Sequence, residues 1–137
     1  DRTVPYDLPR PEFVHWVLVN IPAKTTELSE GQDSDGLTVK GKPGGAMPYG
    51  VRGVNGYTGW FAGDPTMAGT YAGYDGQWPQ FNDESKHNYV FKVYALDVEK
   101  LDLPQTFEFA DFQRASQGHV LADAKLTGSY AIYPKAR

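Results

Sequence analysis

The sequence contains no cysteine among its 137 residues. That absence excludes disulfides, cysteine-based zinc sites and thiol nucleophiles, while reducing and oxidising compartments both accommodate such a chain. A basic excess is also lacking, since 13 Lys and Arg stand against 17 Asp and Glu, for a net charge of −4. Without a basic field, we expect no nucleic-acid partner. Localisation, cytoplasmic or periplasmic, stays open.

Long hydrophobic runs are missing as well. No apolar stretch approaches the roughly 20 residues that a membrane-spanning helix needs, and the opening run DRTVPYDLPRPEF lacks the apolar centre of a signal peptide. We therefore expect no integral membrane segment. The chain starts at Asp1 without Met, so we expect processing or an upstream segment. Its length and its 14% aromatic content predict one folded domain over residues 1–137.

Motifs of common enzymes are scarce too. The three histidines, His15, His87 and His119, form none of the short spacings HxH, HxxxH or HExxH that bind zinc. The sequence has no GxSxG nucleophile motif, and its glycines fit neither a P-loop nor a dinucleotide-binding loop. We therefore expect a protein that is not an enzyme and that needs no metal or cofactor.

Two segments of the chain are typical of strands. Phe13–Ile21 (FVHWVLVNI) is an apolar, β-branched run between two prolines, and it predicts a buried central strand. His87–Leu96 (HNYVFKVYAL) predicts a second strand. Because side chains alternate between the two faces of a strand, His15 shares a face with phenylalanine, valine and isoleucine, and His87 shares one with Tyr89.

Glycines and aromatic residues alternate between these two segments. Eleven of the 15 glycines lie from Gly41 to Gly76. A flexible linker would combine glycine with serine and other polar residues, so this composition predicts a long ordered loop that packs on the body of the protein. We expect its aromatic residues mainly to pack, namely Tyr57, Trp60, Phe61, Tyr71 and Tyr74. We expect nearby acidic residues to be solvated, namely Glu27, Glu30, Asp33 and Asp35.

The last third of the chain predicts a helix followed by a strand. Phe109–Ala124 has apolar residues close to helical spacing, and Leu126–Tyr133 alternates before a proline. His119 falls within the predicted helix, and we expect it to be structural. The order of strand, long loops, strand, helix and strand predicts an α+β fold that is mainly β.

Histidines on two strands admit two interpretations. Each could be a hydrogen-bonded structural residue, which is the commoner case for a single histidine on an apolar strand. If the strands are neighbours, the side chains of His15, His87 and Tyr89 could instead converge near the glycine-rich loop and bind a phosphate or carboxylate oxygen. The residue pattern alone leaves both interpretations open.

Three stretches of sequence carry a family resemblance, and together they cover nearly the whole chain. They are EFVHWVLVNIPA, then AGYDGQWPQFNDESKHNYVFKVYALDVEKLDL, then GHVLADAKLTGSYAIYP. They resemble the phosphatidylethanolamine-binding protein family, in particular its bacterial, Raf-kinase-inhibitor-like branch. The resemblance implies a central antiparallel sheet with a smaller sheet and peripheral helices.

The resemblance also implies a set of ligand-binding residues. His15 stands at the histidine of the family's H-[WF]-x-x-V-N strand. His87 and Tyr89 stand at the histidine and tyrosine of an H-R-Y motif. Pro79, with Trp78 beside it, matches a loop proline that lines the pocket in the family.

This sequence departs from the family pattern in two places. Asn88 replaces the arginine of H-R-Y, which removes any salt link that the arginine makes in relatives. The acidic D-P-D-x-P motif is matched only by DRTVP, with Thr3 at its second aspartate, and we interpret that match as coincidence. The run VPYDLPR, from Val4 to Arg10, resembles an insertion that follows the acidic motif in some bacterial members. We therefore expect the N-terminal strands and the acidic motif to lie upstream of Asp1.

An incomplete sheet would have consequences for association. Missing strands would leave sheet edges and apolar surface exposed, which favours a homodimer or binding of the missing N-terminal segment. On this interpretation, residues 1–137 are the C-terminal portion of a longer domain.

Three functions follow from these observations. The first is a non-catalytic binding protein with a small pocket for a phosphate-type anion or a phospholipid head group. By analogy with the family, such a protein could regulate a kinase or protease by direct contact. The second is a hydrolase-type enzyme that uses His15 and His87 as acid and base. The third is a protein-directed inhibitor whose pocket is vestigial.

Overall fold

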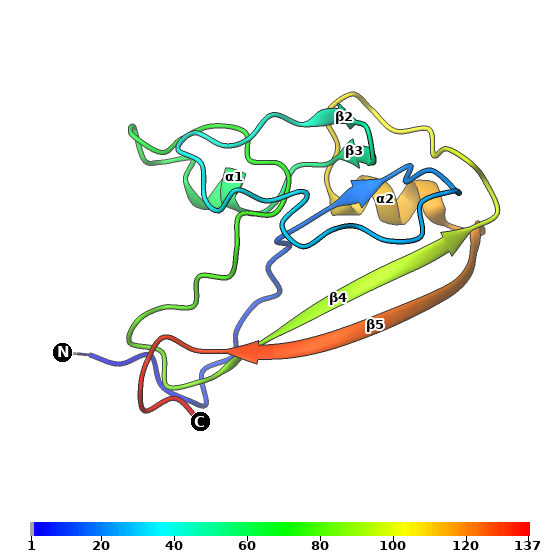
Figure 1. Cartoon of the computed structure of the whole chain (residues 1–137). Coiled ribbons are helices and arrows are strands. Elements are labelled where there is room, and N and C mark those ends of the chain that lie inside the picture. The colour runs from blue at the N-terminus through cyan, green and yellow to red at the C-terminus, as the bar shows by residue number, and fades with distance from the viewer. Residues whose placement is uncertain (1) are drawn as a thin grey trace. The chain divides into compact units, whose positions relative to one another are not determined.

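The computed structural model describes residues 2–137, and the chain divides into two compact units. Unit 1 contains residues up to Glu12 together with Gln77–Ala95 and Ala122–Arg137, and unit 2 contains Phe13–Gly76 and Leu96–Leu121. Strands and ordered loops dominate the described chain (Figure 1). The predicted α+β, mainly β fold class is confirmed. Asp1, where the imperfect match to the acidic motif begins, lies outside the described residues.

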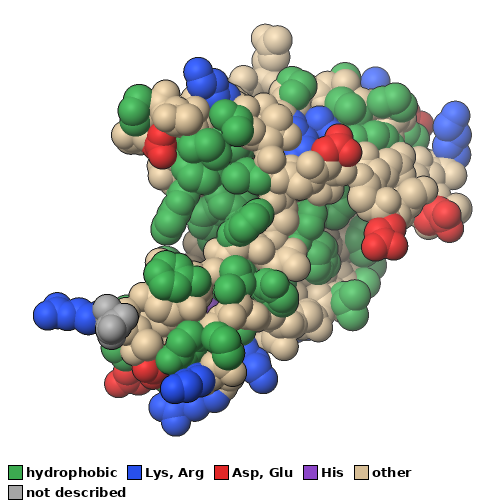
Figure 2. Space-filling view, turned by 60° about the vertical axis from the view of Figure 1, so that its left-hand side comes forward, with side chains coloured by type: hydrophobic (Ala, Val, Ile, Leu, Met, Phe, Trp, Pro, Cys, Tyr) green, Lys and Arg blue, Asp and Glu red, His purple; other side chains and the backbone are tan. Residues whose placement is uncertain are grey.

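A two-stranded sheet of β4 (His87–Leu96) and β5 (Val120–Tyr130) forms a long ribbon (Figure 1). β4 occupies its predicted range, because tyrosine, phenylalanine and valine fit a pleated surface well. All side chains of β5 and most of β4 are exposed. The large apolar side chains exposed on the ribbon are Val90, Phe91, Val93, Val120, Leu121, Leu126 and Tyr130. On the molecular face shown in Figure 2, hydrophobic side chains reach the surface in several places.

The predicted boundary between the last helix and the last strand is wrong. Helix α2 spans only Phe109–Ser116, and β5 starts at Val120. Gly118 adopts a φ of 81°, a left-handed conformation that glycine accepts without strain and that ends the helix. His119 therefore lies between α2 and β5 and not in a helix. At its other end, α2 begins with a capping box in which Glu108 and Asp111 exchange side-chain-to-backbone hydrogen bonds.

Unit 2 contains a small antiparallel sheet in the order β1-β3-β2. β1 is Leu18–Val19, β2 is Gly45–Met47 and β3 is Gly50–Arg52, and β3 pairs with both neighbours. In the register, Val51 faces Val19 on one side and Ala46 on the other.

The predicted strand Phe13–Ile21 is longer than the regular strand that forms. Only β1 within it is a regular strand, although Val17 and Val14 still accept backbone hydrogen bonds from Gly53 and Gly56 in the same register. Asn20 adopts a φ of 53° and bends the chain away immediately after β1. β1 is an edge strand of this sheet, so the prediction of a long central strand over Phe13–Ile21 is wrong.

The glycine-rich segment is ordered, as predicted. It contains β2, β3 and helix α1 (Tyr57–Trp60), and glycine lets its backbone segments meet closely. A Cβ atom on Gly69 would lie 2.2 Å from the carbonyl oxygen of Lys40. Of the aromatic residues expected to pack here, Tyr57 and Tyr71 are buried in the core of unit 2, whereas Trp60 is largely exposed.

Candidate functional site

His87, the first residue of β4, is hydrogen-bonded to a buried carboxylate. Its Nε2 atom lies 2.7 Å from Oδ2 of Asp83, a residue of the loop that precedes β4. The side chain of His87 keeps 26% of its surface exposed, whereas that of Asp83 keeps 2%. The pair thus has a buried acidic end and an imidazole that still reaches solvent.

Asp83 also receives hydrogen bonds from Arg10 and from the backbone. Arg10 donates from Nε to Oδ2 at 2.9 Å and from Nη2 to Oδ1 at 2.5 Å, and the N–H of Ser85 donates to Oδ1 at 2.8 Å. The hydrogen bonds from Arg10, and then those from His87 and Ser85, hold the pKa of Asp83 well below its usual range, although burial acts in the opposite direction. Asp83 is therefore an ionised carboxylate near neutral pH.

Both ends of the chain hold the loop that carries Asp83. Val4 donates a backbone hydrogen bond to Asn82 and accepts one from Glu84, at 3.0 Å and 3.1 Å. Arg137 donates to the carbonyl of Glu84, and Lys86 donates to the carbonyl of Arg137. Segments far apart in sequence therefore fix the position of Asp83 within unit 1.

Three other predicted site residues also belong to unit 1. Tyr89 lies on the same face of β4 as His87, and their ring centroids are 6.4 Å apart with nearly parallel planes. Pro79 is buried, and Trp78 beside it is 60% exposed. The structure thus brings His87 and Tyr89 together as the strand alternation predicts, and it places the proline in the same unit.

The remaining predicted residue, His15, belongs to unit 2. It is half-buried among aromatic rings, with centroid distances of 4.6 Å to Phe13 and 5.7 Å to Tyr57. This setting agrees with the apolar strand face that the sequence predicts. That His15 and His87 share one ligand remains a prediction.

His119 offers an internal comparison with His87. Its Nδ1 atom lies 2.7 Å from Oδ1 of Asp97, so the opposite ring nitrogen from that of His87 faces the carboxylate. Both side chains of this pair are more than 40% exposed. His119 therefore forms a surface pair, whereas His87 is anchored on a buried group.

Sequence reasoning missed Asp83 and Arg10. Asp83 precedes His87 by four residues, but the intervening loop is not helical, so no periodicity singles it out among 17 acidic residues. Arg10 ends the run VPYDLPR, whose sequence gives no sign that it reaches a residue 73 positions away. A search for carboxylates close to His87 in sequence would have raised Asp83 as a candidate.

The prediction that Asp33 is a solvated loop charge is wrong. Its carboxylate is 3% exposed and accepts hydrogen bonds from Trp16 Nε1 and the Tyr49 hydroxyl, both at 2.6 Å, and from Arg52 Nε at 2.5 Å. Burial, and then the hydrogen bond to Asp33, raises the pKa of Tyr49. These groups satisfy one another within unit 2, which is the pattern of a structural network. The other acidic residues of that prediction are exposed, namely Glu27, Glu30 and Asp35.

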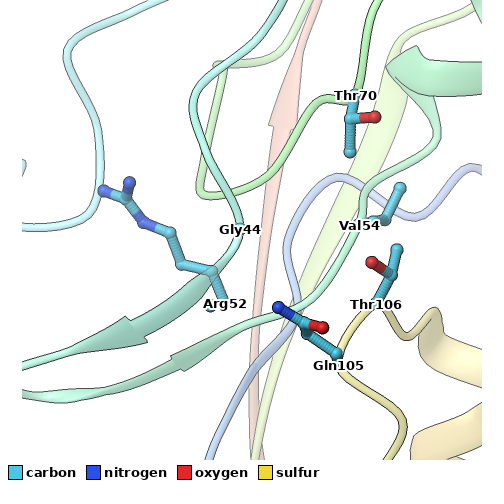
Figure 3. A pocket seen from close by; sticks show the side chains of 7 residues that line it. Gly44, Arg52, Val54, Thr70, Gln105 and Thr106 are labelled. Carbon is cyan, nitrogen blue, oxygen red and sulfur yellow. The ribbon is translucent and has the colours of Figure 1, made fainter.

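A hollow of about 150 Å³ lies in unit 2, and none of the residues that line it is a predicted ligand-binding residue. Figure 3 shows that the guanidinium of Arg52 points away from the other labelled side chains of this hollow. That guanidinium is already bonded to Asp33. The walls are therefore neutral and offer no charge for an anion. The lining residues are Gly44, Gly45, Arg52, Val54, Thr70, Gln105 and Thr106.

Residues 2–137 form neither a metal-binding cluster nor a membrane-spanning helix. Within that range, no group of three or more histidine, aspartate or glutamate side chains is arranged to hold a metal ion. No helix formed by these residues is both long enough and apolar enough to span a membrane.

Comparison with known proteins gives a consistent result. A family model described as phosphatidylethanolamine-binding protein matches residues 3–131. A UPF0098 protein of Methanothermobacter thermautotrophicus is 36% identical over 124 residues, covering 90% of this chain and 66% of the relative. The UPF0098 protein YbhB of Escherichia coli is 34% identical, covering 85% and 61%. The UPF0098 protein of Aquifex aeolicus is 32% identical, covering 90% and 60%. The chain thus spans 60–66% of the lengths of these relatives.

Proposed function

Because the chain belongs to the phosphatidylethanolamine-binding protein family, we propose that it is a non-catalytic binding protein for a small phosphate-type anion or a phospholipid head group. The observation that carries this proposal is the partly exposed imidazole of His87, which is hydrogen-bonded through Nε2 to the buried Asp83. The proposed ligand-binding residues are His15, His87, Tyr89, Pro79 and Trp78.

The chemistry of these side chains fits an oxyanion. Imidazole and phenol groups donate directional hydrogen bonds to oxygen, and the guanidinium of Arg10 is already hydrogen-bonded to Asp83. Two or three hydrogen bonds to a charged group, at about 1.5–3 kcal/mol each, correspond to dissociation constants from roughly millimolar to micromolar. We therefore expect modest affinity for free anions.

The loop before β4 offers a way to distinguish two sources of the same anion. Trp78 and Phe81 are 60% and 76% exposed. Exposed aromatic side chains can pack against the glycerol and ethanolamine parts of a head group, which inorganic phosphate lacks. A head-group ligand should therefore bind more tightly than inorganic phosphate, and Trp78→Ala should remove that advantage.

A titration of the wild-type chain tests the proposal. Inorganic phosphate and glycerophosphoethanolamine are added while the histidine ring resonances are followed by NMR, and affinities are measured by calorimetry. We expect saturable binding that His87→Ala weakens at least tenfold and that the matched variant His119→Ala leaves unchanged. Equal affinity in the His87→Ala and wild-type proteins would contradict the proposal. His15→Ala tests the contribution of unit 2 in the same assay.

One observation favours a hydrolase as the second candidate function. A carboxylate bonded to one imidazole nitrogen is also how aspartate orients a catalytic histidine. A hydrolase that uses His15 and His87 as acid and base would turn over ester substrates, with a bell-shaped pH profile that depends on His87. If the chain binds phosphate-type anions but hydrolyses no such ester, the result supports the non-catalytic binding protein.

Regulation of a kinase or protease by direct contact is proposed by family analogy alone. If His15→Ala and His87→Ala both leave inhibition of such a partner intact, the pocket is vestigial for that role.

A further inference from the structure

The hydrogen bonds of Asp83 fix the position of a proton on His87. Asp83 is ionised and can only accept hydrogen bonds, and it takes four of them, from two nitrogens of Arg10, the N–H of Ser85 and Nε2 of His87. The proton of neutral His87 must therefore sit on Nε2. Its other ring nitrogen, Nδ1, then carries a lone pair and acts as an acceptor.

This tautomer has a consequence for a ligand at Nδ1. An oxyanion without a proton presents only lone pairs, so neutral His87 cannot donate a hydrogen bond to it. The ring becomes a donor at Nδ1 only when it takes up a second proton and becomes an imidazolium. Asp83 keeps a negative charge 2.7 Å from that cation.

Charged groups near this ring come from several segments. The loop before β4 contributes Asp83, and Glu84 and Lys86 also precede His87 in the chain. The N-terminal segment contributes Arg10, which is hydrogen-bonded to Asp83, and the backbone of Arg137 is hydrogen-bonded to Glu84 and Lys86. β4 contributes Tyr89 on the same face. β5 ends beside the start of β4 (Figure 1). Its charged residues, Asp123 and Lys125, lie in its first half, toward the other end of the ribbon.

We propose that Asp83 is a positioning residue that makes anion binding at His87 proton-linked: where the free ring is neutral, one proton is taken up from solvent onto Nδ1 for each unprotonated oxyanion bound. This inference rests on the proposed function and adds how the affinity for an anion depends on pH. Affinity for an anion without an ionisable proton falls as the imidazolium is lost. No covalent bond forms or breaks.

The substitution Asp83→Asn makes a sharp prediction, because the two carboxylate oxygens differ. Oδ1 accepts from Arg10 Nη2 and from the Ser85 N–H, while Oδ2 accepts from His87 Nε2 and Arg10 Nε. The new amide should place its oxygen at the Oδ1 position, next to two obligatory donors, of which one is backbone. Its NH₂ group then faces His87 and donates to Nε2. The ring proton moves to Nδ1, and the neutral ring becomes an anion donor.

The test uses inorganic sulfate, whose charge is constant across the histidine titration. For the wild-type chain, the dissociation constant of sulfate should rise by about tenfold per pH unit at pH values where the free His87 ring is neutral. In Asp83→Asn this slope should fall to near zero. The matched variant Asp97→Asn, at the carboxylate that faces His119, should keep the wild-type slope. A wild-type dissociation constant that stays flat through the titration of the ring would overturn the proposal.

A second measurement needs neither ligand nor variant. In ¹⁵N spectra of the wild-type chain above the ring titration, His87 should show a protonated Nε2 and an unprotonated Nδ1, and His119 the reverse. A neutral His87 that carries its proton on Nδ1 would overturn the role of Asp83, even if anions bind. Absence of saturable sulfate and phosphate binding at every pH, together with the expected tautomer, would instead overturn the proposed function.

Discussion

The buried carboxylate of Asp83 accepts hydrogen bonds from Arg10, Ser85 and His87 within unit 1. Since its folded-state pKa is depressed, its ionised form stabilises the fold above the pKa of an unfolded aspartate, about 4. That stability is lost as the pH falls from there toward the folded pKa. Urea unfolding should show that Asp83→Asn lowers the free energy of unfolding by about 2 kcal/mol near neutral pH, and that the difference shrinks below about pH 4.

The exposed Asp97 gives the control for this prediction. Asp97→Asn removes a carboxylate that also faces a histidine but is not buried, so it should change the free energy of unfolding by less than about 0.5 kcal/mol at every pH. A difference between wild type and Asp83→Asn that stays constant down to about pH 2 would show that the lost charge is not the cause.

The buried Asp33 network makes a second prediction at the residue scale. Asp33→Ala leaves the guanidinium of Arg52, Trp16 Nε1 and the hydroxyl of Tyr49 without their acceptor. Breaking a buried ion pair by removing one partner costs about 3–5 kcal/mol. Asp35→Ala, at an exposed position two residues along, should cost less than about 0.5 kcal/mol. Chemical denaturation measures both, and equal small effects would show that the network does not stabilise unit 2.

The sequence identifies single residues where strand alternation or a family motif marks them. Strand alternation places His87 and Tyr89 on one face, and the family motifs mark His15, Pro79 and Trp78 as proposed ligand-binding residues. Asp83 and Asp33 carry no such signal, because each owes its burial to partners distant in sequence, Arg10 and Arg52 among them. Their roles therefore required the structure.

The strands and helices show where local pattern is sufficient. β4 follows the sequence pattern because its alternation is uninterrupted. α2 ends earlier than the apolar spacing predicts, because the left-handed Gly118 outweighs the periodicity of the residues beyond it. The strand predicted over Phe13–Ile21 ends at Val19 because the backbone of Asn20 turns away, which side-chain hydrophobicity does not predict.

Two backbone segments of unit 2 meet closely at Gly69, in the glycine-rich segment. A Cβ atom at Gly69 would lie 2.2 Å from a backbone oxygen of Lys40, so Gly69→Ala must push two segments of unit 2 apart. We expect a loss of about 2–3 kcal/mol from the free energy of unfolding. Gly59, in α1, has no neighbour within 4 Å of such a Cβ atom, and Gly59→Ala should be neutral or stabilising by up to about 1 kcal/mol. Thermal unfolding separates the two, and equal effects would contradict the close packing.

On the scale of the whole molecule, the chain spans 60–66% of the lengths of its relatives, and the β4–β5 ribbon exposes apolar side chains. Within residues 2–137, no further strand pairs with this ribbon. Open edges and exposed apolar surface favour association between chains. We expect residues 1–137 to self-associate as the concentration rises, which sedimentation velocity measures.

Matched variants localise that association. Leu121 and Leu126 are 70% and 73% exposed on β5, and Val39 is 60% exposed elsewhere. Leu121→Lys and Leu126→Lys should lower the average mass at high concentration, whereas Val39→Lys should not. A wild-type chain that stays monomeric at all concentrations would show that the ribbon does not mediate contacts between copies.

Whether the imidazole of His87 binds anions is measured most simply by titrating the wild-type chain with inorganic phosphate and following ¹H–¹⁵N spectra of the histidine rings. We expect the resonances of the His87 nitrogens, Nδ1 above all, to shift along a saturable curve, while those of the surface residue His119 show only a small linear drift. Equal responses from His87 and His119, or a silent His87, would contradict this expectation.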